Sequence, residues 1–84
     1  MSLQEQFDAA QKRALALKSR PSNDDLLQLY ALYKQATVGN VQGKRPGMMD
    51  FKGRAKFDAW QALDGTAGTD AMQRYVALVT RLAG

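Results

Sequence analysis

Cysteine and histidine are both absent from this 84-residue chain. Without cysteine the chain can form no disulfide and offers no thiol nucleophile. The absence of both residues also removes the usual ligands of zinc fingers and the side chain that most often serves as a catalytic base. Catalysis would have to use carboxylates, lysine, tyrosine and serine, and no constellation of these residues indicates a nucleophile activated by a base.

Long apolar runs are absent as well. The first twenty residues alternate charged and apolar groups, so they do not have the continuous apolar stretch of a signal peptide. No segment approaches the length of a membrane span. We therefore expect a soluble, intracellular, cytoplasmic protein, and 84 residues are enough for one domain and too few for two.

Proline is scarce, with two residues, and it helps to delimit the helices. Apolar residues from Leu3 to Leu17 recur at spacings of four and three, which predicts a helix over about residues 2–17. Pro21 prevents that helix from continuing, and Ser22 followed by Asp25 provides an N-cap and a carboxylate near the positive end of a second helix. We expect this second helix to end near residue 38.

Four glycine and proline residues (Gly39, Gly43, Pro46 and Gly47) punctuate the next segment, which we interpret as a long loop. Asp50 is the expected N-cap of a third helix that reaches about Leu63 and has Phe57, Trp60 and Leu63 on one face. Gly53 near its start lowers helix propensity, so we expect something to approach the backbone there. Thr66 or Thr69 is the expected cap of a fourth helix. The fold class is therefore all-α, a four-helix bundle with the long loop between helices two and three.

The basic residues are unevenly distributed. The net charge is +4, and half of the 12 lysine and arginine residues fall between positions 34 and 56, where Asp50 is the only acid. This pattern favours polyanionic or phosphorylated partners without choosing among them. One hypothesis is a small helical module that binds nucleic acid through residues 34–56. The six basic residues are Lys34, Lys44, Arg45, Lys52, Arg54 and Lys56.

Helix two has two separate faces on a helical wheel. Its apolar surface is too large for a single packing partner. Either the helix is central and packs on both sides, or its second face binds a ligand with an anionic head and an apolar body. Lys34 favours the ligand, because an ammonium group is not buried without a partner. Leu29, Leu32 and Ala36 form the first face, and Leu27, Tyr30, Lys34 and Thr37 form the second.

Three segments of the chain closely resemble the acyl-CoA-binding protein family: YKQATVG at 33–39, RPGMMDFKGRAKFDAW at 45–60 and DAMQRYVALV at 70–79. The resemblance extends over essentially the whole chain. It implies that residues 1–84 form a single acyl-CoA-binding domain that binds long-chain fatty acyl-CoA esters one to one, is not an enzyme, and needs no cofactor or metal. It also implies an intracellular carrier and pool former that contacts membranes or acyl-CoA-using enzymes transiently, with no nucleic-acid partner.

The resemblance also implies roles for individual residues. Tyr30 and Lys34 match family residues around the ribose 3'-phosphate and the adenine, and Lys56 matches a second basic contact. The remaining head-group positions are Tyr33, Lys52 and Tyr75, and the positions lining or flanking the acyl groove are Phe7, Ala10 and Leu27.

Leu15 departs from the family pattern, since the family commonly has a basic residue at this position. We expect either that Arg13 or Lys18 substitutes for it, or that the affinity for the head group is lower. An unreplaced charge-assisted hydrogen bond would cost roughly 1.5 to 3 kcal/mol. An enzyme that acts on acyl-CoA is a third hypothesis, but the sequence offers no base and nucleophile pair for it.

Overall fold

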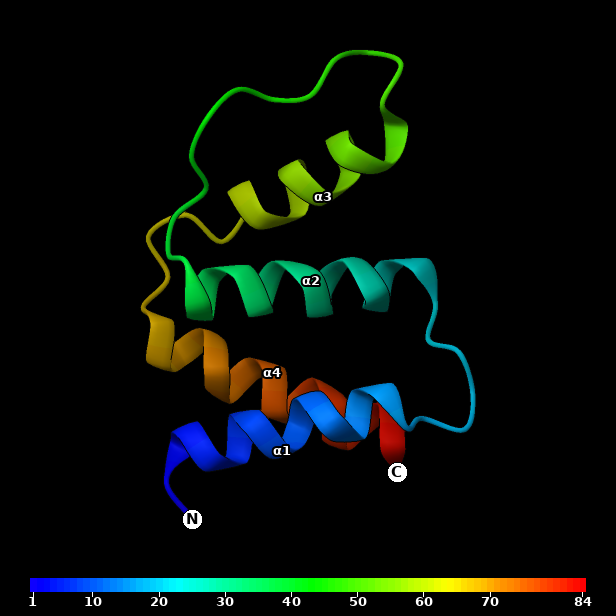
Figure 1. Cartoon of the computed structure of the whole chain (residues 1–84), viewed down its shortest axis with the longest axis vertical. Coiled ribbons are helices and arrows are strands. Elements are labelled where there is room, and N and C mark those ends of the chain that lie inside the picture. The colour runs from blue at the N-terminus through cyan, green and yellow to red at the C-terminus, as the bar shows by residue number, and fades with distance from the viewer.

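The computed structural model describes all 84 residues and contains four helices and no strand (Figure 1). This confirms the predicted all-α, four-helix architecture. No helix has the length and apolar character needed to cross a bilayer. The helices are α1 (Leu3–Leu15), α2 (Asn23–Thr37), α3 (Phe51–Gln61) and α4 (Gly68–Ala83).

Side-chain caps begin the first three helices. At α1, Ser2 and Glu5 form a reciprocal capping box, with both hydrogen bonds at 3.1 Å. The Ser22 hydroxyl accepts from the backbone N–H of Asp25 at 3.1 Å and so begins α2, as predicted. Such caps satisfy backbone donors that have no partner inside the helix.

The third cap explains the glycine in α3. The Asp50 carboxylate accepts from the backbone N–H of Gly53 at 2.9 Å, which confirms Asp50 as the N-cap. A Cβ atom on Gly53 would overlap that same carboxylate. The close approach expected at Gly53 is therefore made by the cap itself.

The predicted threonine cap of α4 is wrong. Ala67 occupies the N-cap position and makes no side-chain hydrogen bond. The backbone N–H of Thr66 donates to Leu63 O at 2.9 Å, so Thr66 still belongs to the turn that follows α3. Thr69 lies within the first turn of α4, one residue after its start. The other predicted C-terminal ends are one or two residues too long, since α1 ends at Leu15, α2 at Thr37 and α3 at Gln61.

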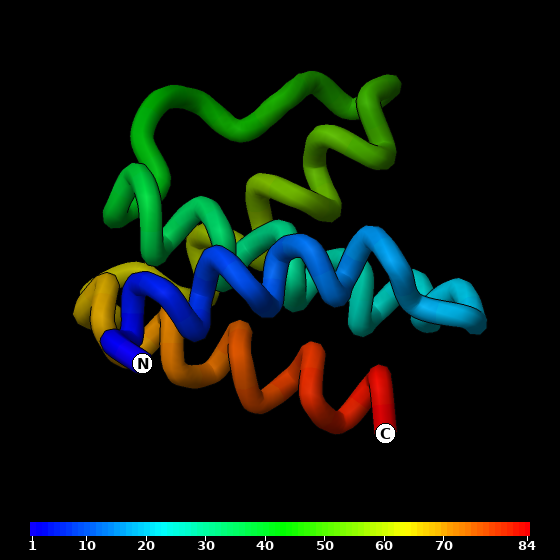
Figure 2. Tube along the Cα trace, turned by 60° about the horizontal axis from the view of Figure 1, so that its bottom comes forward, coloured from blue at the N-terminus to red at the C-terminus, as the bar shows by residue number.

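Helix α2 lies in the middle of the molecule. It contacts α3 on one side and α4 on the other, while α1 packs against α4 (Figures 1 and 2). This confirms that α2 packs on both sides, one of the two alternatives left open by its sequence. The molecule is flat as a result, with extents of 40 × 28 × 14 Å.

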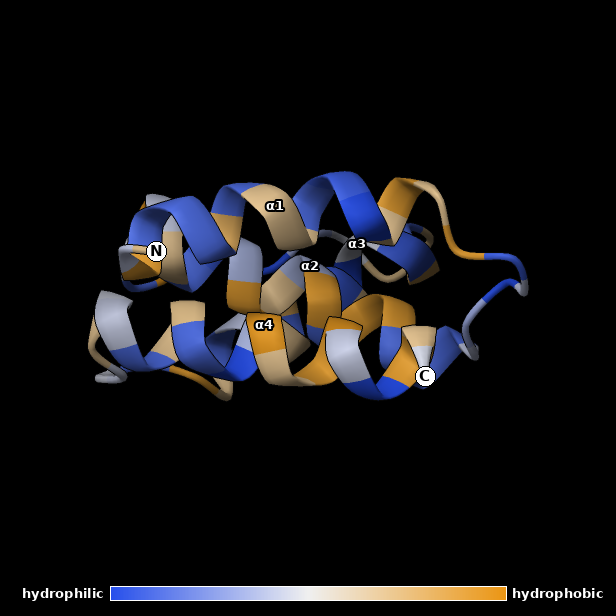
Figure 3. Ribbon diagram, turned by 90° about the horizontal axis from the view of Figure 1, so that it is seen from below, coloured by the Kyte–Doolittle hydropathy of each residue, from blue (hydrophilic) through white to orange (hydrophobic).

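The core lies between α1, α2 and α4 and leaves α3 largely outside it. Apolar segments of α2 and α4 meet in the middle of Figure 3, and α1 presents a largely hydrophilic outer face. No residue of α3 is fully buried, although Trp60 packs against the core and Leu63, just after α3, belongs to it. The side of α2 that faces α3 is therefore less completely packed than the side that faces α4. Nine apolar residues form the core: Phe7, Ala10, Leu29, Ala31, Leu32, Leu63, Ala71, Tyr75 and Val79.

The loop between α2 and α3 arches over α3 (Figure 2) and is fixed at both ends. The Trp60 indole N–H donates to Gly39 O at 2.7 Å, and Gly39 has a positive φ of 98° that favours glycine. Farther along, the Arg45 guanidinium donates to both carboxylate oxygens of Asp58, at 2.9 and 2.7 Å. These hydrogen bonds lower the pKa of Asp58. The loop is thus tied to α3 at two points, Gly39 and Arg45.

Candidate ligand-binding site

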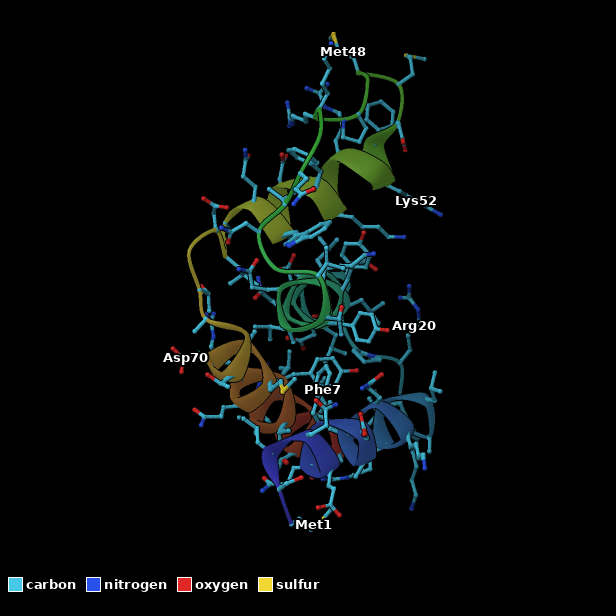
Figure 4. All side chains as sticks on the ribbon, turned by 60° about the vertical axis from the view of Figure 1, so that its left-hand side comes forward. Met1, Phe7, Arg20, Met48, Lys52 and Asp70 are labelled. Carbon is cyan, nitrogen blue, oxygen red and sulfur yellow. The ribbon has the colours of Figure 1, made fainter.

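An open groove of about 450 Å³ lies between α2 and α3. Four of the residues expected to bind a ligand line it: Leu27, Tyr30, Lys52 and Lys56. The chain just before α2 adds Arg20, whose side chain projects on the same side of the molecule as that of Lys52 (Figure 4). The full lining is Arg20, Asn23, Leu26, Leu27, Tyr30, Phe51, Lys52, Ala55 and Lys56.

The groove combines positive charge with apolar surface. Arg20, Lys52 and Lys56 provide three cations, and no acidic residue lines the groove. Arg20 donates a long hydrogen bond of 3.4 Å to the Asn23 side chain, so it is positioned without being neutralised. This arrangement suits a ligand that has both an anionic group and an apolar body. No cluster of histidine, cysteine, aspartate or glutamate large enough to hold a metal ion is present.

Two lysines lie over aromatic rings. Lys56 Nζ on α3 lies 5.3 Å from the ring centroid of Tyr30 on α2, and Lys34 Nζ on α2 lies 5.5 Å from that of Trp60 on α3. Cation–π contact attracts an ammonium group to a ring without cancelling its charge. Neither lysine takes part in the two ion pairs of the structure, Arg45–Asp58 and Arg81–Asp25. Both ammonium groups therefore remain available to an anion.

The remaining aromatic candidates form a separate cluster behind α2. The exposed ring of Tyr33 stacks on Phe7, with centroids 6.1 Å apart and planes at 27°. Phe7 in turn meets Tyr75 edge-on, with centroids 5.1 Å apart. Tyr33 lies about 100° around α2 from its neighbour Lys34, so it faces Phe7 on α1 and not α3. The cluster therefore supports Tyr33 from the core side.

Phe7 and Ala10 lie in the core and not in the groove. Each is 1% exposed, and neither lines the space between α2 and α3. Both had been expected to line or flank the groove for an acyl chain. In this structure Phe7 contacts the ring of Tyr33, and Ala10 packs in the core.

Tyr75 is also buried, and burial raises the pKa of its phenol, with a smaller contribution from the neighbouring Tyr33. The phenol therefore stays protonated through the physiological range. A neutral hydroxyl can both donate and accept a hydrogen bond. Tyr75 would therefore contact a ligand through a hydrogen bond and not through a charge.

Arg20 was missed by the sequence analysis, which had considered Arg13 and Lys18 as replacements at the Leu15 position. Those two residues line a different hollow, beside the end of α4, and Leu15 is 91% exposed. Leu26, Phe51 and Ala55 were missed too. Spacing could have found Leu26, which precedes Tyr30 by one helical turn, and could have grouped Phe51 with Ala55, since they are one turn apart.

The central helix and the cationic groove define a small all-α protein with an open groove that suits an anionic, partly apolar ligand. The Acyl CoA binding protein family model matches residues 4–79. This chain belongs to that family.

Individual relatives agree with this membership. An acyl-CoA-binding protein homolog from Manduca sexta is 53% identical over 83 residues, which cover 98% of this chain and 92% of the relative. An acyl-CoA-binding protein from Brassica napus is 49% identical over 82 residues, which cover 98% and 89%. The crystal structure of Oryza sativa Acyl-CoA-Binding Protein 2 superposes with a TM-score of 0.91 at 46% identity, covering 95% of this chain and 87% of that one.

Proposed function

We propose that this protein binds one long-chain fatty acyl-CoA ester per molecule and serves as an intracellular carrier and pool former, not as an enzyme. In this proposal residues 1–84 act as one acyl-CoA-binding domain. The observation that supports it best is the groove between α2 and α3, in which three cations lie beside apolar side chains with no acid among them. Family membership supports acyl-CoA as the ligand.

The head group of the ligand would lie against the lysines and tyrosines of α2 and α3. Coenzyme A has a 3'-phosphate and a pyrophosphate, so it needs several cations held in fixed positions. Lys34 and Lys56 are held over rings on facing helices, which restricts them without neutralising them. Tyr30 and Tyr33 offer flat faces for the adenine, and Lys52 adds a further cation at the groove. Tyr75 would contribute its neutral hydroxyl.

The acyl chain would follow the apolar part of the groove along Leu26, Leu27 and Ala55. Removing a sixteen-carbon chain from water is worth up to about 12 kcal/mol, at ~0.8 kcal/mol for each methylene. Ordering of the chain and incomplete burial reduce this value. The apolar term should therefore dominate the affinity, while the head group determines which esters are recognised. A carrier of this kind must also release its ligand at membranes or to enzymes that use acyl-CoA.

Isothermal titration with palmitoyl-CoA below its micelle concentration tests the proposal, with free CoA, free palmitate and a short DNA duplex as comparisons. We expect one-to-one binding of the ester, far weaker binding of CoA and palmitate, and no salt-sensitive DNA binding. Lys34→Ala should weaken ester binding roughly ten- to a hundredfold, as expected for a lost charge-assisted hydrogen bond. Lys12→Ala, an exposed lysine on α1, should not.

Equal affinity for CoA and palmitoyl-CoA would rule out the groove as an acyl site. If the ester fails to bind and DNA binds in a salt-sensitive manner, the basic segment 34–56 functions as a nucleic-acid module instead.

A further inference from the structure

Three large apolar side chains within four residues of one another in the sequence are exposed where the α2–α3 loop enters α3. Met48, Met49 and Phe51 are 77%, 88% and 75% exposed, and we call them the apolar tip. In Figure 4 Met48 marks the end of the molecule farthest from α1. Contiguous exposed apolar residues with polar neighbours are typical of sites that meet a membrane or another protein.

The tip is held in a defined shape. The backbone N–H of Asp50 donates to Gly47 O at 3.0 Å, which closes a turn with Met48 and Met49 at its two central positions. These positions are usually occupied by glycine, asparagine, aspartate, serine or proline. The Arg45–Asp58 pair ties the loop to α3 just before this turn, and the Asp50 cap begins α3 just after it. The two methionines are therefore presented to solvent by fixed structure on both sides.

Positive charge flanks the tip. Lys44 and Lys52 are exposed and neither forms an ion pair in this structure. Asp50, the only acid between positions 34 and 56, directs its carboxylate to the backbone N–H of Gly53. The surface around the apolar side chains is thus basic, with its one carboxylate engaged.

We propose that the apolar tip docks the protein on an anionic lipid surface. The tip lies at the end of the molecule farthest from α1 (Figure 4), a position from which it can insert among lipid head groups. Methionine and phenylalanine supply apolar area for the interface, and the flanking lysines are complementary to anionic lipid. Phe51 also lines the groove, so docking places the groove beside the bilayer. In that position the ligand would pass between the bilayer and the groove, and this transfer rests on the proposed function.

Vesicle flotation of the ligand-free protein tests the docking. The wild type should bind vesicles of phosphatidylcholine that contain phosphatidylserine, and bind vesicles of phosphatidylcholine alone more weakly. Met48→Ser combined with Met49→Ser should lower partitioning at least about tenfold, because two apolar side chains are lost from the interface. Leu15→Ser, which removes an equally exposed apolar side chain from α1, is the matched control and should leave partitioning unchanged.

The charge contribution has its own pair of variants. Lys44→Gln should weaken binding to the anionic vesicles about fivefold, whereas Lys12→Gln on α1 should leave it unchanged. A chain without cysteine also allows a single fluorophore at Met49→Cys. Its emission should shift to the blue on anionic vesicles, and that of the same label at Leu15→Cys should not.

The outcomes separate this inference from the proposed function. Met48 and Met49 do not line the groove, so the double variant should keep the wild-type affinity for palmitoyl-CoA. A wild type that ignores anionic vesicles, or a double variant that binds them equally well, overturns the docking, whatever the result for acyl-CoA. Sedimentation velocity that reveals a dimer lost in the double variant would make the occupant a second copy of this chain, and would overturn it too.

Discussion

Lys34 and Lys56 lie over aromatic rings and not beside carboxylates. This placement limits the motion of each ammonium group without pairing it with a carboxylate. The family resemblance predicted both lysines, and also Tyr30, as ligand contacts, which remains a prediction. It could not identify Trp60 as the partner of Lys34, because that contact depends on how α3 packs against α2. Residue identity and spacing give the chemistry available, whereas tertiary packing determines which groups meet.

Tyr75 leads to a prediction about alkaline pH. Its folded-state pKa is raised above the ordinary value of 10.0 by burial, so the unfolded chain loses this proton at a lower pH than the native protein does. The Tyr75 contribution to stability is therefore complete below pH 10 and declines as pH rises above it. The free energy of urea unfolding, measured at pH 9 and pH 11, should fall less in Tyr75→Phe than in the wild type. An identical fall in both proteins would contradict the buried phenol.

At the level of single elements, the start of α3 combines a capping aspartate, Asp50, with Gly53. Only glycine fits at position 53, because a Cβ atom there would overlap the Asp50 carboxylate. Sequence reasoning predicted both the Asp50 cap and a close approach at Gly53, because glycine in a helix needs a local reason. It also placed a threonine cap on α4, but Thr66 belongs to the turn after α3 and Thr69 lies inside α4. Caps are predictable where one polar residue precedes a helix, and less so where a turn and a helix follow each other directly.

Gly53→Ala should destabilise the protein, although alanine is the better helix former. The new Cβ atom would displace the Asp50 carboxylate from its cap, and the lost cap costs about 1 kcal/mol. Gly68→Ala is the matched comparison, because a Cβ atom there meets only Ala36 O at an ordinary 3.5 Å. It should raise the free energy of unfolding by about 0.5 kcal/mol. Urea unfolding followed by circular dichroism measures both, and a stabilised Gly53→Ala would contradict this account.

Gln35 connects three elements from a buried position on α2. Its side-chain N–H groups donate to Asn40 Oδ1 in the loop and to Thr66 O before α4, both at 2.9 Å. Gln35→Leu should lower the free energy of unfolding by about 1 to 3 kcal/mol, because Thr66 O loses its donor in a part-buried site.

Gln28→Leu, an exposed glutamine on the same helix, is the control for this change and should alter stability little. Both variants can be compared by urea unfolding at neutral pH. Equal stability of the two variants would mean that the Gln35 hydrogen bonds contribute nothing net.

For the molecule as a whole, apolar spacing and helix stops were sufficient to predict four helices and the long loop. The excess apolar surface of α2 left two alternatives open, a central position or a ligand-binding face, and the packing of α2 against both α3 and α4 shows the central position. The resemblance assigned Phe7 and Ala10 to the acyl groove, whereas both are buried in the core. Helix spacing marks an apolar face without saying which neighbour covers it. The sequence could not place Arg20 in the groove either, since that depends on the path of the chain between α1 and α2.

The arrangement of the helices also explains why a groove forms where it does. α1, α2 and α4 share the core, while α3 contacts only α2 and has no fully buried residue. The space between α2 and α3 is therefore the place where a ligand can contribute apolar contacts that the protein itself does not make.

Titration calorimetry with a series of acyl-CoA esters of increasing chain length tests this account most directly. The head group is constant in the series, so any change in affinity reports the apolar groove alone. We predict that affinity rises with each added methylene, by at most about fourfold per methylene, from short chains toward sixteen carbons. The same dissociation constant for a short-chain and a long-chain ester would show that the groove between α2 and α3 does not hold the acyl chain.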